Sequence, residues 1–324
     1  MGGAQVIIDP DEHTIKELVN ESPASTIHVM AGARWTRLGN RALFHCMAAG
    51  ARMGIMSESP DPRGLLSIGR RIRYALERCR YGYAYRFVLA MGEIGISWFR
   101  RCGYPNERIF PFAYITDSPP PAELSKPVNG ETVLYVGQLI PRKGLDILLH
   151  AFAAMADNIV RLQLQGDGSE QNRLTQIAKR LGIQSRVEWL GSGRPSDVRK
   201  HMCAARLIVL PSRHDGWGAV VNESLMAGTP VVCSSACGAA ELIRYPWLGS
   251  VFQKGSADDL TRVLRHWVEL GPRTPAERER VRAWSDCISG PAVAKYFEAI
   301  LDHVYDDGPR PTAPWRMPLK EGGL

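Results

Sequence analysis

The chain has no long hydrophobic run, no paired cysteine spacing and no leader-like start. Its longest apolar stretches, at 207–210 and 231–233, fall far short of the ~20 residues that a membrane-spanning helix needs. The 7 cysteines include no Cys-x-x-Cys pair, which argues against a disulfide framework and against structural zinc. Residues 1–10 carry no basic head followed by an apolar run, so we expect a cytoplasmic protein.

The sequence also lacks repeats, low-complexity blocks and an extreme composition. Hydrophobic residues make up 45% and charged residues 23% of the 324 residues, close to the average of globular proteins. This length favours two domains over one. The formal net charge of +7 is unevenly spread, because residues 63–101 alone hold 9 arginines against 2 acids.

Short apolar runs alternate with helix-period segments from Glu131 onward, which is typical of βαβ units in a parallel sheet. The expected strands lie at 133–136, 162–165, 187–190, 207–210, 230–233 and 250–252. The expected helices lie at about 145–155, 171–181, 196–204, 219–227 and 257–270. The first part is less regular, with candidate strands at 5–8, 27–30, 53–57, 87–91 and 109–112. The sequence therefore predicts an α/β fold with two doubly wound, Rossmann-like domains.

Four prolines between Thr116 and Gly130 mark the expected domain boundary, because proline cannot continue a helix or a central strand. The expected organisation is an N-terminal domain over 1–120, a Pro-rich linker over 121–130, a C-terminal domain over 131–289, and a helix at 290–305 within a C-terminal segment over 290–324.

A glycine-rich segment with two acids follows the expected strand at 207–210. Gly216 and Gly218 precede a helix, where backbone amides can approach an anion and the helix dipole favours negative charge. We therefore expect a diphosphate site here. Asp215 lies before this helix and Glu223 inside it, so both carboxylates are expected at the carboxyl ends of the strands, where open α/β sheets bind ligands.

A second motif, Gly137-Gln-Leu-Ile-Pro-Arg-Lys-Gly144, follows the expected strand at 133–136. Arg142 and Lys143 would reach the same sheet edge and suit phosphate oxygens. The pattern lacks the Walker G-x-x-x-x-G-K-[ST] spacing, so an ATPase loop is excluded. Gly166-Asp-Gly168 is a third glycine turn, and a plain turn and a ligand contact both remain open for it.

The order Gly-x-Leu-x-x-x-Lys-Gly, Gly-Asp-Gly and Asp-Gly-Trp-Gly-x4-Glu-x-x-x-Ala-Gly-x-Pro resembles the nucleotide-sugar half of the retaining family 4 glycosyltransferases of GT-B fold. The resemblance covers residues 131–305. The family's usual motif is Glu-x7-Glu, and here Asp215 takes the first place and Glu223 the second. An aspartate keeps the charge and shortens the reach by one methylene, so donor choice is expected to shift.

The resemblance implies a role for each motif residue. Glu223 would hydrogen-bond the donor ribose, Asp215 would contact the transferred sugar, and Arg142 and Lys143 would neutralise the leaving diphosphate. These four form the implied catalytic set, with no metal and no cofactor. The implied donor-binding residues are Gly137, Arg142, Lys143, Gly166, Asp215, Gly216, Trp217, Gly218, Ala219 and Glu223. The fold implies two domains that face a cleft, with the last helix crossing back to the first domain.

The implied function is retaining transfer of a hexose-type sugar from a nucleoside diphosphate donor to a saccharide acceptor, expected to be lipid-linked and part of a bacterial surface polysaccharide. Residues 1–120 are few for the family's first domain, so we expect an incomplete acceptor-side domain, in which Ser57 and Glu58 are candidate acceptor contacts. Two alternatives remain: a non-catalytic nucleotide-sugar-binding or partner subunit, and a nucleotide-sugar epimerase.

The arginine-rich segment has an apolar stripe at helical spacing, formed by Leu65, Ile68, Ile72, Leu76 and Cys79. One interpretation is peripheral contact with an anionic membrane at the cytoplasmic face, since basic amphipathic helices bind such lipid. The other is a core helix whose arginines face solvent. RNA binding ranks lower because no recognition-module pattern is present, so no nucleic-acid partner is expected.

Overall fold

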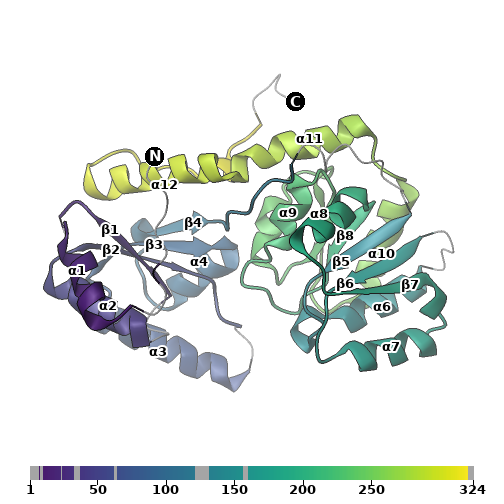
Figure 1. The fold of residues 1–324 in the computed structure, drawn as a ribbon, viewed down its shortest axis with the longest axis horizontal. Helices are drawn as coiled ribbons and strands as arrows, with labels where there is room; N and C mark the ends of the chain where they lie inside the picture. Colours follow the sequence, from purple (N-terminus) through teal and green to yellow (C-terminus); the bar gives the residue numbers. More distant parts are fainter. Residues whose placement is uncertain are drawn as a thin grey trace. The chain divides into compact units, whose positions relative to one another are not determined.

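The computed structural model describes residues 7, 10–22, 24–32, 37–61, 64–120, 131–155 and 160–319. The chain divides into unit 1, Met1–Phe112 with Val304–Gly308, and unit 2, Ala113–His303 with Pro309–Leu324. Each unit contains one parallel sheet with helices packed on it (Figure 1). The predicted fold class, α/β with two parallel-sheet domains, is confirmed. Within the described ranges, no helix is both long and apolar enough to cross a membrane.

Unit 1 has four parallel strands in the order β1-β2-β3-β4. The strands are β1 Ile27–Ala31, β2 Arg52–Ser57, β3 Tyr85–Met91 and β4 Ile109–Phe112. The helices of this unit are α1 Glu12–Asn20, α2 Arg37–Ala48, α3 Leu65–Tyr81 and α4 Gly92–Arg101. All four helices contribute to one core with the sheet, through buried side chains such as Val19, Leu43, Tyr74 and Phe99. The burial of these hydrophobic side chains between the helices and the sheet stabilises unit 1.

Unit 2 has six parallel strands in the order β10-β9-β8-β5-β6-β7. The strands are β5 Thr132–Val136, β6 Arg161–Gln165, β7 Val187–Gly191, β8 Leu207–Leu210, β9 Val231–Ser234 and β10 Gly249–Phe252. Strand β5 is central in this sheet, and β6 and β7 follow it toward one edge. The chain then returns to β8, which pairs with β5 on its other side. The pair β5 and β8 is therefore the point where strand order reverses, and doubly wound sheets bind ligands there.

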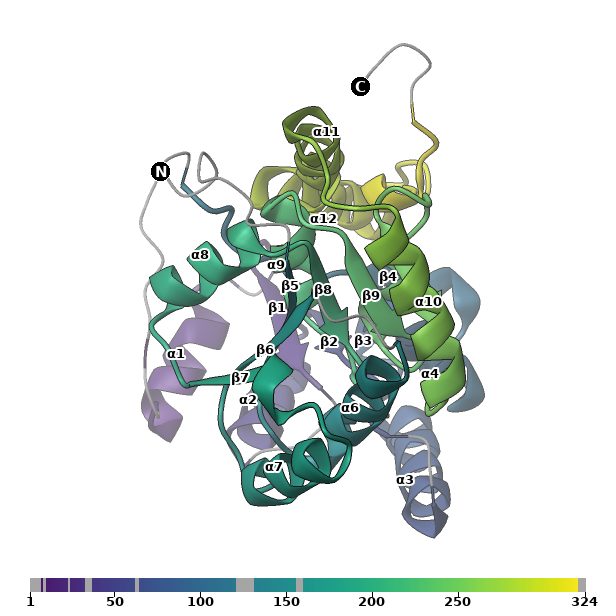
Figure 2. The ribbon, with the colours of Figure 1, turned by 90° about the vertical axis from the view of Figure 1, so that its right-hand side faces the viewer.

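The helices of unit 2 are α6 Leu145–Ala154, α7 Gln171–Arg180, α8 Pro195–Ala204, α9 Val220–Met226, α10 Ala257–Glu269, α11 Pro275–Ser285 and α12 Gly290–Tyr305, of which the last two residues belong to unit 1. Helix α6 packs against α7 and α10, whereas α9 packs against α8 and α11. Right-handed crossovers put α6 and α7 on one face of the sheet and α8 and α9 on the other, because the direction of winding reverses after β7 (Figure 2).

The division of the chain differs from the predicted boundary at residue 120. Residues from Ala113 onward belong to unit 2. The backbone carbonyl of Tyr114 accepts a hydrogen bond from Asn222 Nδ2 at 2.9 Å, and the Thr116 hydroxyl donates to Met226 Sδ at 3.3 Å. Because of these contacts with α9, the segment from Ala113 to the first of the prolines belongs to unit 2. The predicted linker 121–130 and most of the predicted strand 5–8 lie outside the described residues.

A buried arginine joins α11 to the elements that carry the site. Arg278 donates to the carbonyl oxygens of Cys203 (2.6 Å), Ala205 (3.1 Å) and Ala227 (3.2 Å) and to Thr229 Oγ1 (2.8 Å). Burial lowers its pKa to about 10, so the guanidinium stays charged at neutral pH. It thereby satisfies carbonyls at the C-terminal ends of α8 and α9, which would otherwise be unpaired.

We expect Arg278→Met to lower the free energy of unfolding by about 3 kcal/mol or more, because several buried acceptors lose their donor at once. Arg280→Met on the same helix is the control. It removes an exposed cation–π contact with Trp247, which is worth about 0.5–1 kcal/mol. Urea denaturation followed by tryptophan fluorescence compares the two. Equal midpoints for both variants would show that these carbonyl contacts do not hold α11 in place.

Candidate functional site

The candidate site is built from the two loops that follow β5 and β8. Strands β5 and β8 are paired, with Val133 opposite Leu207 and Leu134 opposite Ile208. The first loop runs through a short 3-10 turn, Pro141–Lys143, into α6, and the second runs from Pro211 into α9. Because the two following helices cover opposite faces of the sheet, these loops diverge at the point where a ligand is expected.

A charged cluster joins the two loops. Lys143 Nζ lies 2.6 Å from Asp215 Oδ2, and an Arg142 guanidinium nitrogen lies 3.5 Å from Asp215 Oδ1. The hydroxyl of Ser212 donates to Asp215 Oδ2 at 3.2 Å. Asp215 is only 7% exposed, whereas the Arg142 side chain is 41% exposed. Two cations around one buried carboxylate leave the cluster with net positive charge, which suits an anionic ligand.

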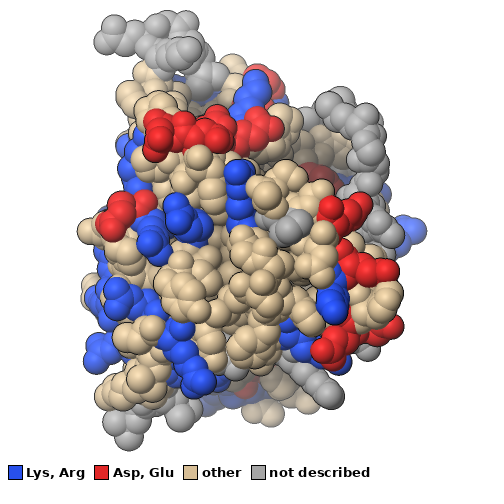
Figure 3. Space-filling view, turned by 90° about the vertical axis from the view of Figure 1, so that its left-hand side faces the viewer, with Lys and Arg blue, Asp and Glu red and all other residues tan. Residues whose placement is uncertain are grey.

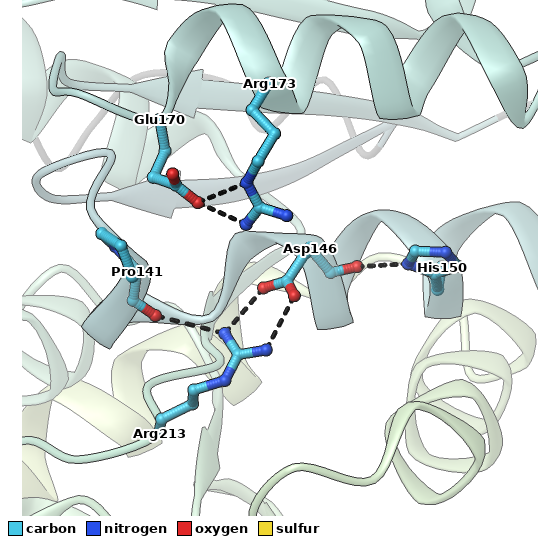
Figure 4. A network of polar contacts seen from close by, with 6 residues as sticks. All are labelled: Pro141, Asp146, His150, Glu170, Arg173 and Arg213. Carbon is cyan, nitrogen blue, oxygen red and sulfur yellow. Dashed lines mark hydrogen bonds and ion pairs between the residues drawn. The ribbon is translucent and has the colours of Figure 1, made fainter.

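A second ion pair fixes the geometry of that cluster (Figure 4). The Arg213 guanidinium donates to both carboxylate oxygens of Asp146, at 2.7 Å each, and to the carbonyl of Pro141 at 3.2 Å. The Arg213 backbone N–H also donates to the Arg142 carbonyl at 2.8 Å. Burial raises the pKa of Asp146, but hydrogen bonds and charge from Arg213 outweigh it and the pKa is lowered overall. We call this pair the loop clamp, since it ties the Arg142 turn to the β8 loop.

Close backbone contacts explain two of the glycines in this region. Gly144 has φ +67°, and a Cβ there would lie 2.3 Å from the Pro211 carbonyl oxygen. Gly166 has φ +138°, and its Cβ would lie 2.0 Å from the Gly137 carbonyl oxygen. Any side chain would push the loops apart, so glycine is required at both positions.

The amides of two predicted donor-binding glycines already have partners. The Gly137 N–H donates to the Gln165 carbonyl at 2.9 Å, and the Gly166 N–H donates to the Gly191 carbonyl at 2.8 Å. The structure therefore gives these glycines a packing role, in which they hold the turns after β5, β6 and β7 together.

The predicted diphosphate loop is buried at Gly216, Trp217 and Gly218 and partly exposed at Ala219. The Trp217 side chain is buried and donates from Nε1 to Asn222 Oδ1 at 2.8 Å, while the Trp217 carbonyl accepts from Cys237 Sγ at 2.7 Å. The indole is thus part of the core, and it has no direct role in ligand contact. In the part of the chain that the structure describes, no acceptor is recorded for the amides of Gly216 to Ala219.

Glu223 lies in a separate pocket of about 410 Å³ on unit 2. Its lining residues come from the segment after β4, the β7–α8 loop, α8 and α9, and are Ile115, Thr116, Asp117, Pro119, Gly193, Pro195, Val198, Arg199 and Glu223. Burial raises the pKa of Glu223, and the nearby Arg199 charge opposes this more weakly. Among the described residues, no hydrogen bond or ion pair engages its carboxylate. A half-buried carboxylate in a pocket is suited to bind hydroxyl groups.

The structure brings Arg142, Lys143 and Asp215 together, as predicted, but it places Glu223 in a separate pocket rather than in the same cluster. Ser57 and Glu58 stand at the carboxyl end of β2 in unit 1, where the Ser57 hydroxyl donates to the Glu58 carbonyl at 3.0 Å. No set of three or more His, Cys, Asp or Glu side chains within metal-binding distance occurs in the described residues.

Sequence reasoning missed the residues that position the cluster. An acid in the first turn of a helix, such as Asp146, is common because it stabilises the helix N-terminus, so it does not indicate a site. No sequence pattern marks Arg213 as a functional residue. Their pairing spans 67 residues, so no local spacing reveals it. Asn222 was missed for the same reason, because its partner Tyr114 lies 108 residues away.

Comparisons with known proteins identify the family of the chain. Residues 120–283 match the family model of the group 1 glycosyl transferases. The lipopolysaccharide core biosynthesis glycosyltransferase LpsE of Rhizobium meliloti is 32% identical over 147 residues, which cover 45% of this chain and 42% of that protein. The lipopolysaccharide glucosyltransferase WaaG of Escherichia coli is 29% identical over 192 residues, which cover 56% of this chain and 49% of WaaG.

Thus the chain matches about half the length of these curated relatives. Among solved structures, HepE of Anabaena in complex with UDP is similar, with a TM-score of 0.71, 20% identity, and coverage of 90% of this chain and 82% of HepE. At this identity the similarity supports the fold. Since the family model covers half of the chain, including both loops of the candidate site, the chain belongs to the group 1 glycosyl transferases.

Proposed function

We propose that the chain is a retaining family 4 glycosyltransferase that moves a hexose from a nucleoside diphosphate sugar to a saccharide acceptor without a metal ion. The observation that carries this proposal is the convergence of Arg142 and Lys143 on Asp215, directly before the loop 216–219, at the reversal between β5 and β8. In this proposal, cations from one loop and backbone amides from the other bind the same diphosphate.

The chemistry of transfer explains why such a site needs fixed positive charge. When the bond between the sugar and the phosphate breaks, negative charge grows on the diphosphate oxygens. Preorganised cations and amides stabilise that charge more strongly in the transition state than in the bound donor, and this lowers the barrier. In the proposed reaction, Arg142, Lys143 and the amides of Gly216 to Ala219 supply this stabilisation in place of a metal ion.

We assign Glu223 and its pocket to the ribose of the donor, and Asp215 to the hydroxyls of the transferred sugar. The pocket volume of about 410 Å³ is in the range of small-molecule sites. Asp215 is held by Lys143, so it is fixed in orientation before the sugar binds. Retention would follow from attack by the acceptor on the face that the diphosphate leaves.

For the acceptor, we propose a saccharide carried on a lipid during surface polysaccharide assembly at the cytoplasmic face of a membrane. LpsE and WaaG, by their names, act in lipopolysaccharide synthesis. Ser57 and Glu58, at the end of β2, are the proposed acceptor contacts in unit 1.

Donor binding tests the assignment of the site directly. Calorimetric titration with UDP-glucose, GDP-mannose and ADP-glucose identifies the donor, and Lys143→Ala and Glu223→Ala should each weaken its binding about tenfold or more, the effect of losing a charged hydrogen bond. Lys179→Ala, on the exposed surface of α7, removes the same charge elsewhere and should leave the affinity unchanged.

A transfer assay with the identified donor then separates the candidate functions. Sugar transfer to a saccharide acceptor with unchanged anomeric configuration supports the proposal. Binding without turnover would favour the non-catalytic partner subunit, and conversion of the donor sugar without transfer would favour an epimerase. If no donor binds to the folded chain, the assignment of the site is wrong.

Donor affinity should also depend on pH through Glu223. Burial raises the pKa of this group above its ordinary 4.5, so the carboxylate is protonated earlier than usual as the pH falls. Because protonation removes the charge that binds ribose hydroxyls, affinity should fall as the pH is lowered from neutral into the acidic range, and it should begin to fall at a higher pH than for an ordinary glutamate. Calorimetry across this range should show the decline in the native chain and its loss in Glu223→Gln. The same decline in both would assign it to another group.

A further inference from the structure

Helix α3 of unit 1 presents an apolar stripe to solvent. Ile68, Ile72 and Leu76 are 49%, 55% and 63% exposed, and their spacing of four residues aligns them along one side of the helix. Tyr74 and Tyr81 are buried and lie on the opposite side at 100° per residue. The interpretation of this stripe as the core-facing side of the helix is therefore wrong.

The aromatic residues of α3 and α4 explain which side is buried. The Tyr74 ring packs edge-on against Trp98 at 5.4 Å and against Phe99 at 6.1 Å between ring centroids. These large rings fill the space between the two helices, so the aliphatic side chains stay outside. A hollow of about 300 Å³ beside the stripe is lined in part by Ile72 and Leu76.

Arginines border the stripe on both sides. At 100° per residue, Arg73 and Arg80 lie along one edge and Arg71 and Arg78 along the other, and all four are exposed. The helix has a single acid, Glu77, which pairs with Arg73 at 3.2 Å. On the face shown in Figure 3, Lys and Arg are most numerous to the left and lower left, whereas Asp and Glu are most numerous along the top and right.

The combination of stripe and border selects one class of partner. A second copy of the chain would bring arginines against arginines, which is repulsive. A nucleic acid would satisfy the arginines, but its backbone offers no apolar surface for isoleucine and leucine. An anionic lipid surface satisfies both, because aliphatic side chains enter the acyl boundary while arginines reach the headgroups.

We propose that α3 docks unit 1 on a membrane that contains anionic phospholipid, with Ile68, Ile72 and Leu76 inserted and the four bordering arginines at the headgroups. The helix lies in the plane of the interface and does not cross it. This proposal does not rest on the donor site, and its test uses no sugar nucleotide, so either can fail without the other.

Vesicle co-sedimentation of the full chain tests the proposal. The probes are vesicles of phosphatidylcholine alone and of phosphatidylcholine with phosphatidylglycerol, and only the anionic vesicles should bind strongly. Arg71→Gln/Arg78→Gln should lower the partition coefficient about 25-fold, at about fivefold per arginine. Ile72→Ser/Leu76→Ser should lower it at least tenfold, the effect of about 1.4 kcal/mol of apolar burial.

Two control variants make the same chemical changes on unit 2. Lys179→Gln/Arg180→Gln removes two charges from α7, and Val251→Ser/Leu270→Ser removes two exposed apolar side chains. Both should bind vesicles like the native chain. Cys79 is the only exposed cysteine of the seven, so a polarity-sensitive dye attached there should shift to the blue when anionic vesicles are added.

Three results would overturn the proposal. The first is no binding to anionic vesicles at low salt. The second is full retention of vesicle binding by the Ile72→Ser/Leu76→Ser variant. This result would show that the chain binds vesicles by charge attraction alone, without insertion of the stripe. The third is a dimer, or tight binding to single-stranded RNA, that this same variant abolishes, which would assign the stripe to another partner.

Discussion

The site depends on how one buried carboxylate is paired. Asp215 lies in the loop after β8 with little contact with water, and an ionised group in such a position is costly unless cations and donors surround it. Lys143 and Arg142 pair with it from the neighbouring loop. The loop clamp, Arg213 with Asp146, holds the turn that carries these cations. The need to pair Asp215 therefore brings positive charge to the place where the sheet topology already favours a ligand.

The sheet of unit 2 could be predicted from the sequence because its strands are buried on both faces. Such strands appear as short, continuous apolar runs, and β8 was predicted with its observed bounds, Leu207–Leu210. Helix α11 was not predicted, although Thr274 and Glu277 form a capping box at its start. Its apolar positions are few, and its buried anchor is an arginine, so hydrophobic periodicity gives little signal there.

The site was predictable where local motifs meet the sheet edge, and unpredictable where distant side chains pair. Because β5 and β8 are parallel neighbours, the loops after them begin at the same sheet edge, which brings Arg142 and Lys143 near Asp215. The loop clamp requires a contact between residues 67 positions apart, which only the folded chain reveals. On α3, the stripe itself was visible in the sequence, but periodicity cannot tell whether a stripe faces the core or solvent. The bulky ring of Tyr74, buried against α4, decides that question.

The most direct measurement is a crystal structure of the chain with UDP or the identified nucleoside diphosphate bound. The account predicts that the diphosphate lies between Lys143 with Arg142 and the amides of Gly216 to Ala219, with the ribose within hydrogen-bond distance of the Glu223 carboxylate. A nucleotide bound elsewhere on unit 2, or one whose diphosphate contacts neither loop, would contradict it.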